Sequence, residues 1–136
     1  MNTKRFVGAS LAVFVTNQVT DLIIHGGILS STYDSLKNIW RAEMESTMWI
    51  MYVTSFVFAF LFIYIFSKGY EGKGISEGIK YGIIIGLLMN VVGMFNQYAV
   101  YPIPFILTIQ WFIYGMIQYT IYGILAALIY RPNTTA

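Results

Sequence analysis

Three polar residues near the end of the first hydrophobic segment have the spacing of a single helical face. Asn17, Asp21 and His25 are each four residues apart in the stretch TNQVTDLIIHGG, and residues four apart lie on the same side of a helix. A carboxylate beside an imidazole can bind a proton, a divalent metal ion or a polar ligand. The same residues can also be the hydrated end of a membrane helix, and the sequence leaves both interpretations open.

Other segments can bring further polar residues to this stripe. Arg41 is a candidate partner for the Asp21 carboxylate, because a charge inside a membrane must be paired or reach water. We therefore expect a polar ligand-binding cluster that draws on three hydrophobic segments and the long first connection. Its expected members are Asn17, Asp21, His25, Arg41, Glu43, Asn96 and Gln110.

A metal ion has only weak candidate ligands in the same region. Asp21, His25, Glu43 and Glu45 offer one nitrogen and several oxygens, but their spacing matches no metal-binding motif. The single histidine and the absence of cysteine limit haem, zinc-thiolate and thiol chemistry. The sequence contains no nucleophile elbow, zinc-protease motif or phosphate-binding loop, so we predict no catalytic residue and no cofactor.

The elements that carry these residues are hydrophobic enough to cross a membrane. Hydrophobic residues make up 57% of the 136 residues and charged residues 10%, whereas a soluble domain carries about 25% charged residues. Apolar runs of the ~20 residues that a membrane helix needs predict spans at 6–24, 47–66, 79–99 and 105–130. The predicted fold is an all-α integral membrane protein, with residues 1–136 forming one four-helix bundle.

The connections between the predicted spans fit this bundle. Residues 67–78 form a short charged, glycine-rich turn, and two prolines lie in the turn before the last span. Gly26 and Gly27 are expected to end the first helix. The long first connection is expected to contain a short amphipathic helix on the membrane surface near residues 34–45.

Basic residues are distributed unevenly between the two ends of the predicted bundle. One end has six of the eight: Lys4, Arg5, Lys68, Lys73, Lys80 and Arg131. Lys37 and Arg41 lie at the other end. The positive-inside rule therefore predicts that both termini are cytoplasmic, in a multi-pass protein of a bacterial inner (plasma) membrane. A net charge of +2 is too small to indicate binding to nucleic acid.

Small residues recur along one face of the third span. Glycines every four residues allow another helix backbone to approach closely, and an asparagine continues their face. The candidate packing residues there and on the last span are Gly78, Gly82, Gly86, Asn90, Gly115 and Gly123. We favour packing of these two helices on each other. The alternative is a homo-oligomer or a larger membrane complex that forms through the Gly78–Gly82–Gly86 face.

Much of the chain resembles a group of small bacterial four-helix membrane proteins of unknown function. The resemblance lies in FLFIYIFSKGYEGKGISEGIKYGIIIGLL (60–88), YAVYPIP (98–104), the Trp-x-Ile-Tyr-Gly pattern from Trp111, and IWRAEM (39–44). It extends from about residue 40 to residue 130. The resemblance implies the four-span topology and implies no activity.

These observations predict a small, non-enzymatic binding or accessory subunit with an outward-facing polar pocket, whose surroundings are the lipid bilayer. A small transporter or proton-coupled permease acting as an oligomer is the first alternative. It would need polar residues in the cytoplasmic halves of the helices, where few occur. A lipid-modifying membrane enzyme, with Asp21 and His25 as an acid–base pair, is the second alternative.

Overall fold

Helices form all the regular structure in residues 1–131, which are the residues that the computed structural model describes. The long helices are α1 (Thr3–Ile23), α3 (Met44–Gly69), α4 (Ile75–Val100) and α5 (Phe105–Ile129). A π-helical turn, η1 (Ile24–Ile28), continues α1, and a short helix, α2 (Ser30–Ser35), follows it. Four helices are long and apolar enough to cross a membrane. The predicted all-α four-helix class is confirmed, and the chain is a multi-pass membrane protein.

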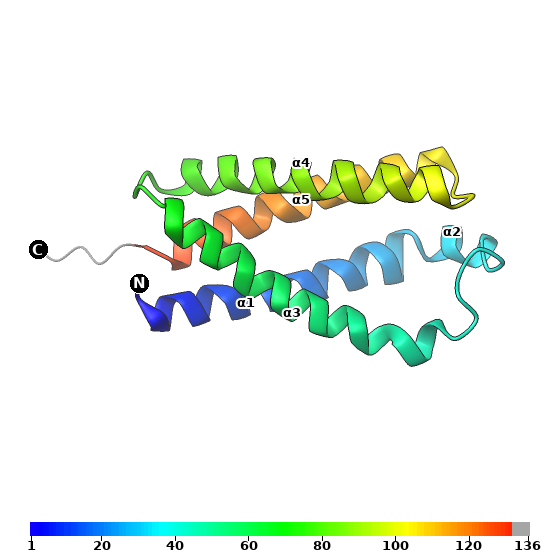
Figure 1. Cartoon of the computed structure of the whole chain (residues 1–136), viewed down its shortest axis with the longest axis horizontal. Helices are drawn as coiled ribbons and strands as arrows, with labels where there is room; N and C mark the ends of the chain where they lie inside the picture. Colours follow the sequence, from blue (N-terminus) through cyan, green and yellow to red (C-terminus); the bar gives the residue numbers. More distant parts are fainter. Residues whose placement is uncertain (132–136) are drawn as a thin grey trace, which may run out of the picture.

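The two ends of the bundle carry different connections. The start of α1, the turn between α3 and α4, and the end of α5 lie at one end (Figure 1), which we call the terminal end. The opposite end carries η1, α2 and the turn before α5 (Figure 1), and we call it the loop end. An even number of helices that cross in alternate directions produces this arrangement. The side of the membrane that each end faces stays a prediction.

The first helix does not stop at its two glycines. Gly26 and Gly27 lie inside the π-helical turn, so the helical backbone continues to Ile28. The turn closes on itself, because the backbone N–H of Leu29 donates to the carbonyl oxygen of Ile24 at 2.8 Å. The glycines were expected to end the first helix; the α-helix ends before them at Ile23, and the π-helical turn ends one residue after Gly27.

The short helix of the first connection also lies earlier than expected. It covers Ser30–Ser35, and residues 36–43 form turns rather than a helix over 34–45. The physical reason lies at Tyr33, whose carbonyl oxygen accepts the backbone N–H of Leu36 at 3.1 Å and the indole N–H of Trp40 at 3.2 Å. These bonds fold the chain back on α2 instead of extending it.

Helices α4 and α5 make the closest approach in the bundle, and the glycines lie at their interface. A Cβ atom at Gly78 would overlap the carbonyl oxygen of Gly123, and one at Gly82 would overlap that of Tyr119. A Cβ at Gly115 would overlap the side chain of Asn90, which is buried. The glycine face of α4 is thus covered by α5 within the chain, so a partner could use it only by displacing α5.

Two apolar clusters hold the ends of the bundle together. The cluster at the terminal end joins α1, α3 and α5 through Ala9, Val13, Ala59, Phe62, Ile63, Phe66, Tyr122, Ala126, Ala127 and Tyr130. The cluster at the loop end is smaller and contains Ile24, Leu29, Ile103 and Leu107. The first half of α3 belongs to neither cluster, and its apolar side chains point outward, with Trp49 63% exposed. Such a surface suits contact with lipid.

We expect Gly82→Ala to destabilise the bundle, whereas Gly93→Ala should leave its stability unchanged or slightly raise it, because alanine is the better helix former. A methyl group at residue 82 must push α5 away, and overpacking typically costs about 1–3 kcal/mol. Gly93 lies on the same helix, and a Cβ there meets no atom. Thermal unfolding of both variants in detergent, followed by circular dichroism, measures the difference. Equal unfolding midpoints would contradict the tight α4–α5 contact.

Candidate functional site

A carboxylate inside the bundle is held by amide groups from two helices. Asp21 accepts a hydrogen bond from the side-chain amide of Asn17, one turn earlier on α1, at 3.1 Å. Its other oxygen accepts the amide of Gln118, on α5, at 2.8 Å. Gln118 also donates to the hydroxyl of Thr20 at 2.8 Å, and Asn17 donates to the hydroxyl of Tyr122 at 2.9 Å. We call these five residues the Asp21 cluster.

The Asp21 cluster lies deeper than the loop end of the bundle. Asn17 is near the middle of the Thr3–Ile28 span, and Gln118 is near the middle of α5. Gln118 and Tyr122 are buried, whereas the Asp21 side chain is 36% exposed. A carboxylate near the centre of a membrane helix costs roughly 2.5–3.5 kcal/mol on insertion scales. Two amide donors offset part of that cost, and the exposed part of the side chain stays accessible to a ligand.

An aromatic cluster lies next to the Asp21 cluster, toward the loop end. It consists of His25 from η1, Tyr33 from α2, Trp40 from the following turn and Trp111 from α5. His25 stacks on Tyr33 with ring centroids 5.8 Å apart, and Tyr33 meets Trp40 edge-on at 5.5 Å. Each of the four side chains is only partly buried. The cluster therefore presents aromatic surface beside a carboxylate.

Hydrogen bonds connect the aromatic cluster in a defined donor-to-acceptor order. The Trp111 indole donates to the Tyr33 hydroxyl oxygen at 2.7 Å, and this hydroxyl lies 2.5 Å from Nδ1 of His25. An indole N–H can only donate, so the hydroxyl hydrogen is available for His25. A neutral imidazole that accepts it carries its own proton on Nε2, which lies 4.0 Å from Asp21. His25 thus links the aromatic rings to the carboxylate.

The environment of Tyr33 keeps its phenol protonated. Burial raises the pKa of Tyr33 above its ordinary value of 10.0, the hydrogen bond from Trp111 opposes this rise, and the negative charge of Asp21 adds to it. Tyr33 is therefore a neutral hydroxyl at physiological pH, as its bond to His25 requires.

The structure brings together only part of the expected polar cluster. Asn17, Asp21 and His25 are adjacent as expected. Arg41 and Glu43 are exposed in the turns after α2, and Asn96 is exposed on α4. Among residues 1–131, no ion pair joins Arg41 to Asp21. This corrects the expected closure of Arg41 over Asp21, and the cause is the early fold-back of the chain at Tyr33.

Gln110 lies on the same helix as Gln118 but takes no part in the Asp21 cluster. It is half-buried in the second turn of α5, close to the loop end. Its expected place in the cluster is taken by Gln118, two helical turns further along.

The weak metal candidates do not form a coordination site either. Within the described part of the chain, no three histidine or acidic side chains lie close enough to hold a metal ion. Glu43 and Glu45 are exposed at the start of α3, away from the fold-back that carries His25 and Tyr33. The expectation that Glu43 and Glu45 approach Asp21 is therefore corrected as well.

Sequence reasoning missed the residues that complete the cluster. Thr20, Gln118 and Tyr122 are among its members, and Tyr33 and Trp111 connect it to the loop end. The available signal was the residue type: glutamine is rare enough in an apolar span to be expected in a hydrogen bond with another polar group. Its correct partner depends on how α1 is aligned along α5, and the sequence does not provide this alignment.

Comparison with known proteins identifies one matching family, and the function of that family is unknown. Residues 29–104 match the model of DUF6768, a family of unknown function. The matched segment contains α2, α3 and α4, and it includes Tyr33 and Trp40 but not Asp21 or Gln118. No curated protein matches the chain, and no solved structure matches it. The bacterial origin that the resemblance implied stays a prediction.

We expect Gln118→Leu to destabilise the bundle, because it removes the donor to both Asp21 and Thr20. A double-mutant cycle with Asp21→Ala should give a coupling of about 0.6 kcal/mol and at most about 1.7 kcal/mol, the range for hydrogen bonds between membrane helices. Thermal unfolding in detergent provides the free energies. Gln110→Leu, the same change on the same helix, should show no coupling to Asp21→Ala; equal coupling for both glutamines would refute the contact.

The raised pKa of Tyr33 predicts a loss of stability in alkali. The unfolded chain loses this phenolic proton near pH 10.0, before the folded chain does, so the contribution is complete below that pH. It disappears as pH rises through the higher folded pKa. We expect the unfolding midpoint to fall less steeply between about pH 8 and pH 12 for Tyr33→Phe than for wild type. Tyr101→Phe, at an exposed tyrosine, should retain the wild-type slope.

Proposed function

The chain belongs to DUF6768, a family of unknown function whose model matches more than half of its residues, and we propose that it is a small membrane protein that binds an organic cation. The proposed site is the Asp21 carboxylate together with the neighbouring aromatic cluster. The role is non-enzymatic, as a binding or accessory subunit, and the site opens toward the outer side of the membrane if the basic terminal end is cytoplasmic.

The observation that carries this proposal is a carboxylate whose close partners are neutral. Both Asp21 oxygens accept hydrogen bonds from amides, and amides leave the negative charge in place. Among residues 1–131, His25 is the only basic side chain within ion-pair distance of it, at 4.0 Å. A cation that approaches the exposed part of the carboxylate gains an ion pair in a medium of low dielectric constant.

The aromatic rings favour an organic ammonium over a metal ion. A cation over the face of tryptophan or tyrosine gains about 0.5–2 kcal/mol, and such rings recognise quaternary ammonium groups. Trp111 and Trp40 have centroids 6.4 Å apart, and Tyr33 lies beside both. A metal ion would need at least one more carboxylate or imidazole ligand than this site offers.

Proton-coupled transport of the same cation is the second candidate function. The supporting observation is the depth of the polar contacts, which continue from His25 through Asp21 and Asn17 to Tyr122. Transport requires the bound cation to cross the membrane, so uptake of the probe into protein-containing vesicles distinguishes transport from binding.

We expect the protein in detergent to bind tetramethylammonium, with a saturable change in tryptophan fluorescence. Asp21→Asn should weaken binding at least about tenfold, which corresponds to 1.4 kcal/mol, because it removes the charge and retains the shape. Asp34→Asn is the matched control, since Asp34 is exposed on α2 and faces Lys37 at 3.8 Å. The proposal fails if no saturable binding occurs, or if both variants weaken it equally.

A further inference from the structure

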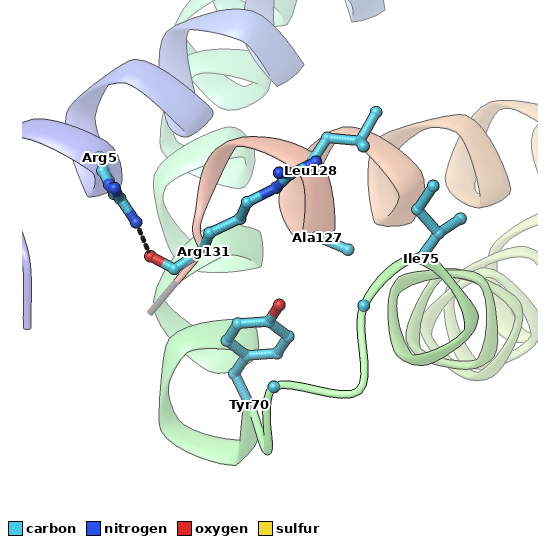
Figure 2. Close-up of a pocket in the computed structure, with 8 residues that line it drawn as sticks. Arg5, Tyr70, Ile75, Ala127, Leu128 and Arg131 are labelled. Carbon is cyan, nitrogen blue, oxygen red and sulfur yellow. Dashed lines mark hydrogen bonds between the residues drawn. The ribbon is translucent and has the colours of Figure 1, made fainter. Parts of the chain in front are cut away.

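A recess lies at the terminal end of the bundle, far along the helices from Asp21. It is a cavity of about 460 Å³ whose lining comes from α1, the turn after α3, the start of α4, and the end of α5 with the residue that follows it. Figure 2 shows its side chains: Arg5 and Arg131 on one side, Tyr70 below them, and Ile75 across the opening. Because four helix ends meet here, the recess lies at the depth of a membrane surface.

The lining of this recess is cationic. It contains two arginines and no acidic residue. Arg5 donates to the backbone carbonyl oxygen of Arg131 (Figure 2), which ties the start of α1 to the end of α5. Within residues 1–131, no carboxylate forms an ion pair with the guanidinium of Arg131. Arginine presents a planar set of donors that matches the oxygens of a phosphate group.

The nearby acidic residues are engaged elsewhere. Glu77 accepts the backbone N–H groups of Glu71 at 2.6 Å and Lys73 at 2.9 Å, and Glu71 pairs with Lys73. These bonds hold the turn in a shape that needs φ values of +81° at Gly72 and +77° at Gly74, where glycine is favoured. The turn is therefore a formed wall of the recess, and within residues 1–131 neither Glu71 nor Glu77 forms an ion pair with Arg131.

The remaining lining suits a lipid rather than a small anion alone. The hydroxyl of Tyr70 is directed toward the space between Arg131 and Ile75 (Figure 2), where it can donate a further hydrogen bond. Ile75 is 47% exposed and Leu128 is 37% exposed, so an apolar surface continues from the recess onto the outside of α4 and α5. A phosphate headgroup could enter the recess while its acyl chains follow that surface.

We propose that this recess binds a phosphate group at the membrane surface, with the headgroup of an anionic phospholipid as its source. Arg131 pairs with the phosphate oxygens, Tyr70 donates to them, and Arg5 adds positive charge. Basic pockets between membrane helices recognise anionic headgroups through the same interactions. The site is separate from Asp21 and does not depend on the proposed cation binding.

The test compares three probes on delipidated protein in a neutral detergent. Calorimetry measures Kd for dihexanoyl phosphatidylglycerol, dihexanoyl phosphatidylcholine and inorganic phosphate. We expect phosphatidylglycerol to bind at least about fivefold more tightly than phosphatidylcholine, since each basic residue contributes about a factor of five at a membrane surface. Arg131→Gln should weaken phosphatidylglycerol binding by about the same factor, and Tyr70→Phe should weaken it less.

Lys37→Gln is the control. Lys37 is an exposed basic residue at the loop end, so its loss should leave phosphatidylglycerol binding unchanged. Inorganic phosphate that binds as tightly as the lipid, and loses affinity in Arg131→Gln, would support the phosphate site and identify a soluble ester as its source. Equal affinity for the two lipids, or equal loss in Arg131→Gln and Lys37→Gln at unchanged unfolding midpoints, would overturn the proposal.

Discussion

The need to satisfy one carboxylate inside an apolar bundle constrains how the helices fit together. Asp21 cannot face hydrocarbon without a large cost, and its donors come from its own helix and from α5. The bond from Gln118 aligns residue 21 of α1 with residue 118 of α5. Apolar side chains alone specify such a position weakly, because one packed layer can replace another. One apolar cluster packs toward the terminal end and the other toward the loop end, with the Asp21–Gln118 contact between them.

The two ends of the bundle have opposite chemistry. The aromatic rings at the loop end lie beside the negative charge of Asp21, and the terminal end combines positive charges with a polar turn. Between them, α4 and α5 form a close pair that leaves no room for side chains at their glycines. Helix α1 packs on α5 of this close pair. The first half of α3 leaves the bundle toward the loop end and exposes its apolar surface there.

Hydrophobic run length was sufficient to predict the four helices, because the cost of burying polar groups in lipid leaves few other structures. The stripe of Asn17, Asp21 and His25 was also visible, because it depends only on helical spacing. The partners of Asp21 were not predictable in the same way. Gln118 and Gln110 have the same residue type on the same helix, and only the alignment of α1 with α5 distinguishes them. Arg41 was expected nearby because charge was considered without the fold-back at Tyr33.

The π-helical turn has a consequence for how the loop end tolerates changes in length. Each residue of an α-helix advances the chain by about 100° around the axis, and a π turn takes up one residue more than an α turn before the chain resumes. Tyr33 meets His25 across this turn, so the number of residues in η1 contributes to the angle between α1 and α2. Loss of one glycine from η1 would keep every side chain of the Asp21 cluster and of the aromatic cluster, and every long helix. It would nonetheless rotate α2, with Tyr33, around the helix axis relative to α1, with Asp21 and His25, by about 100°.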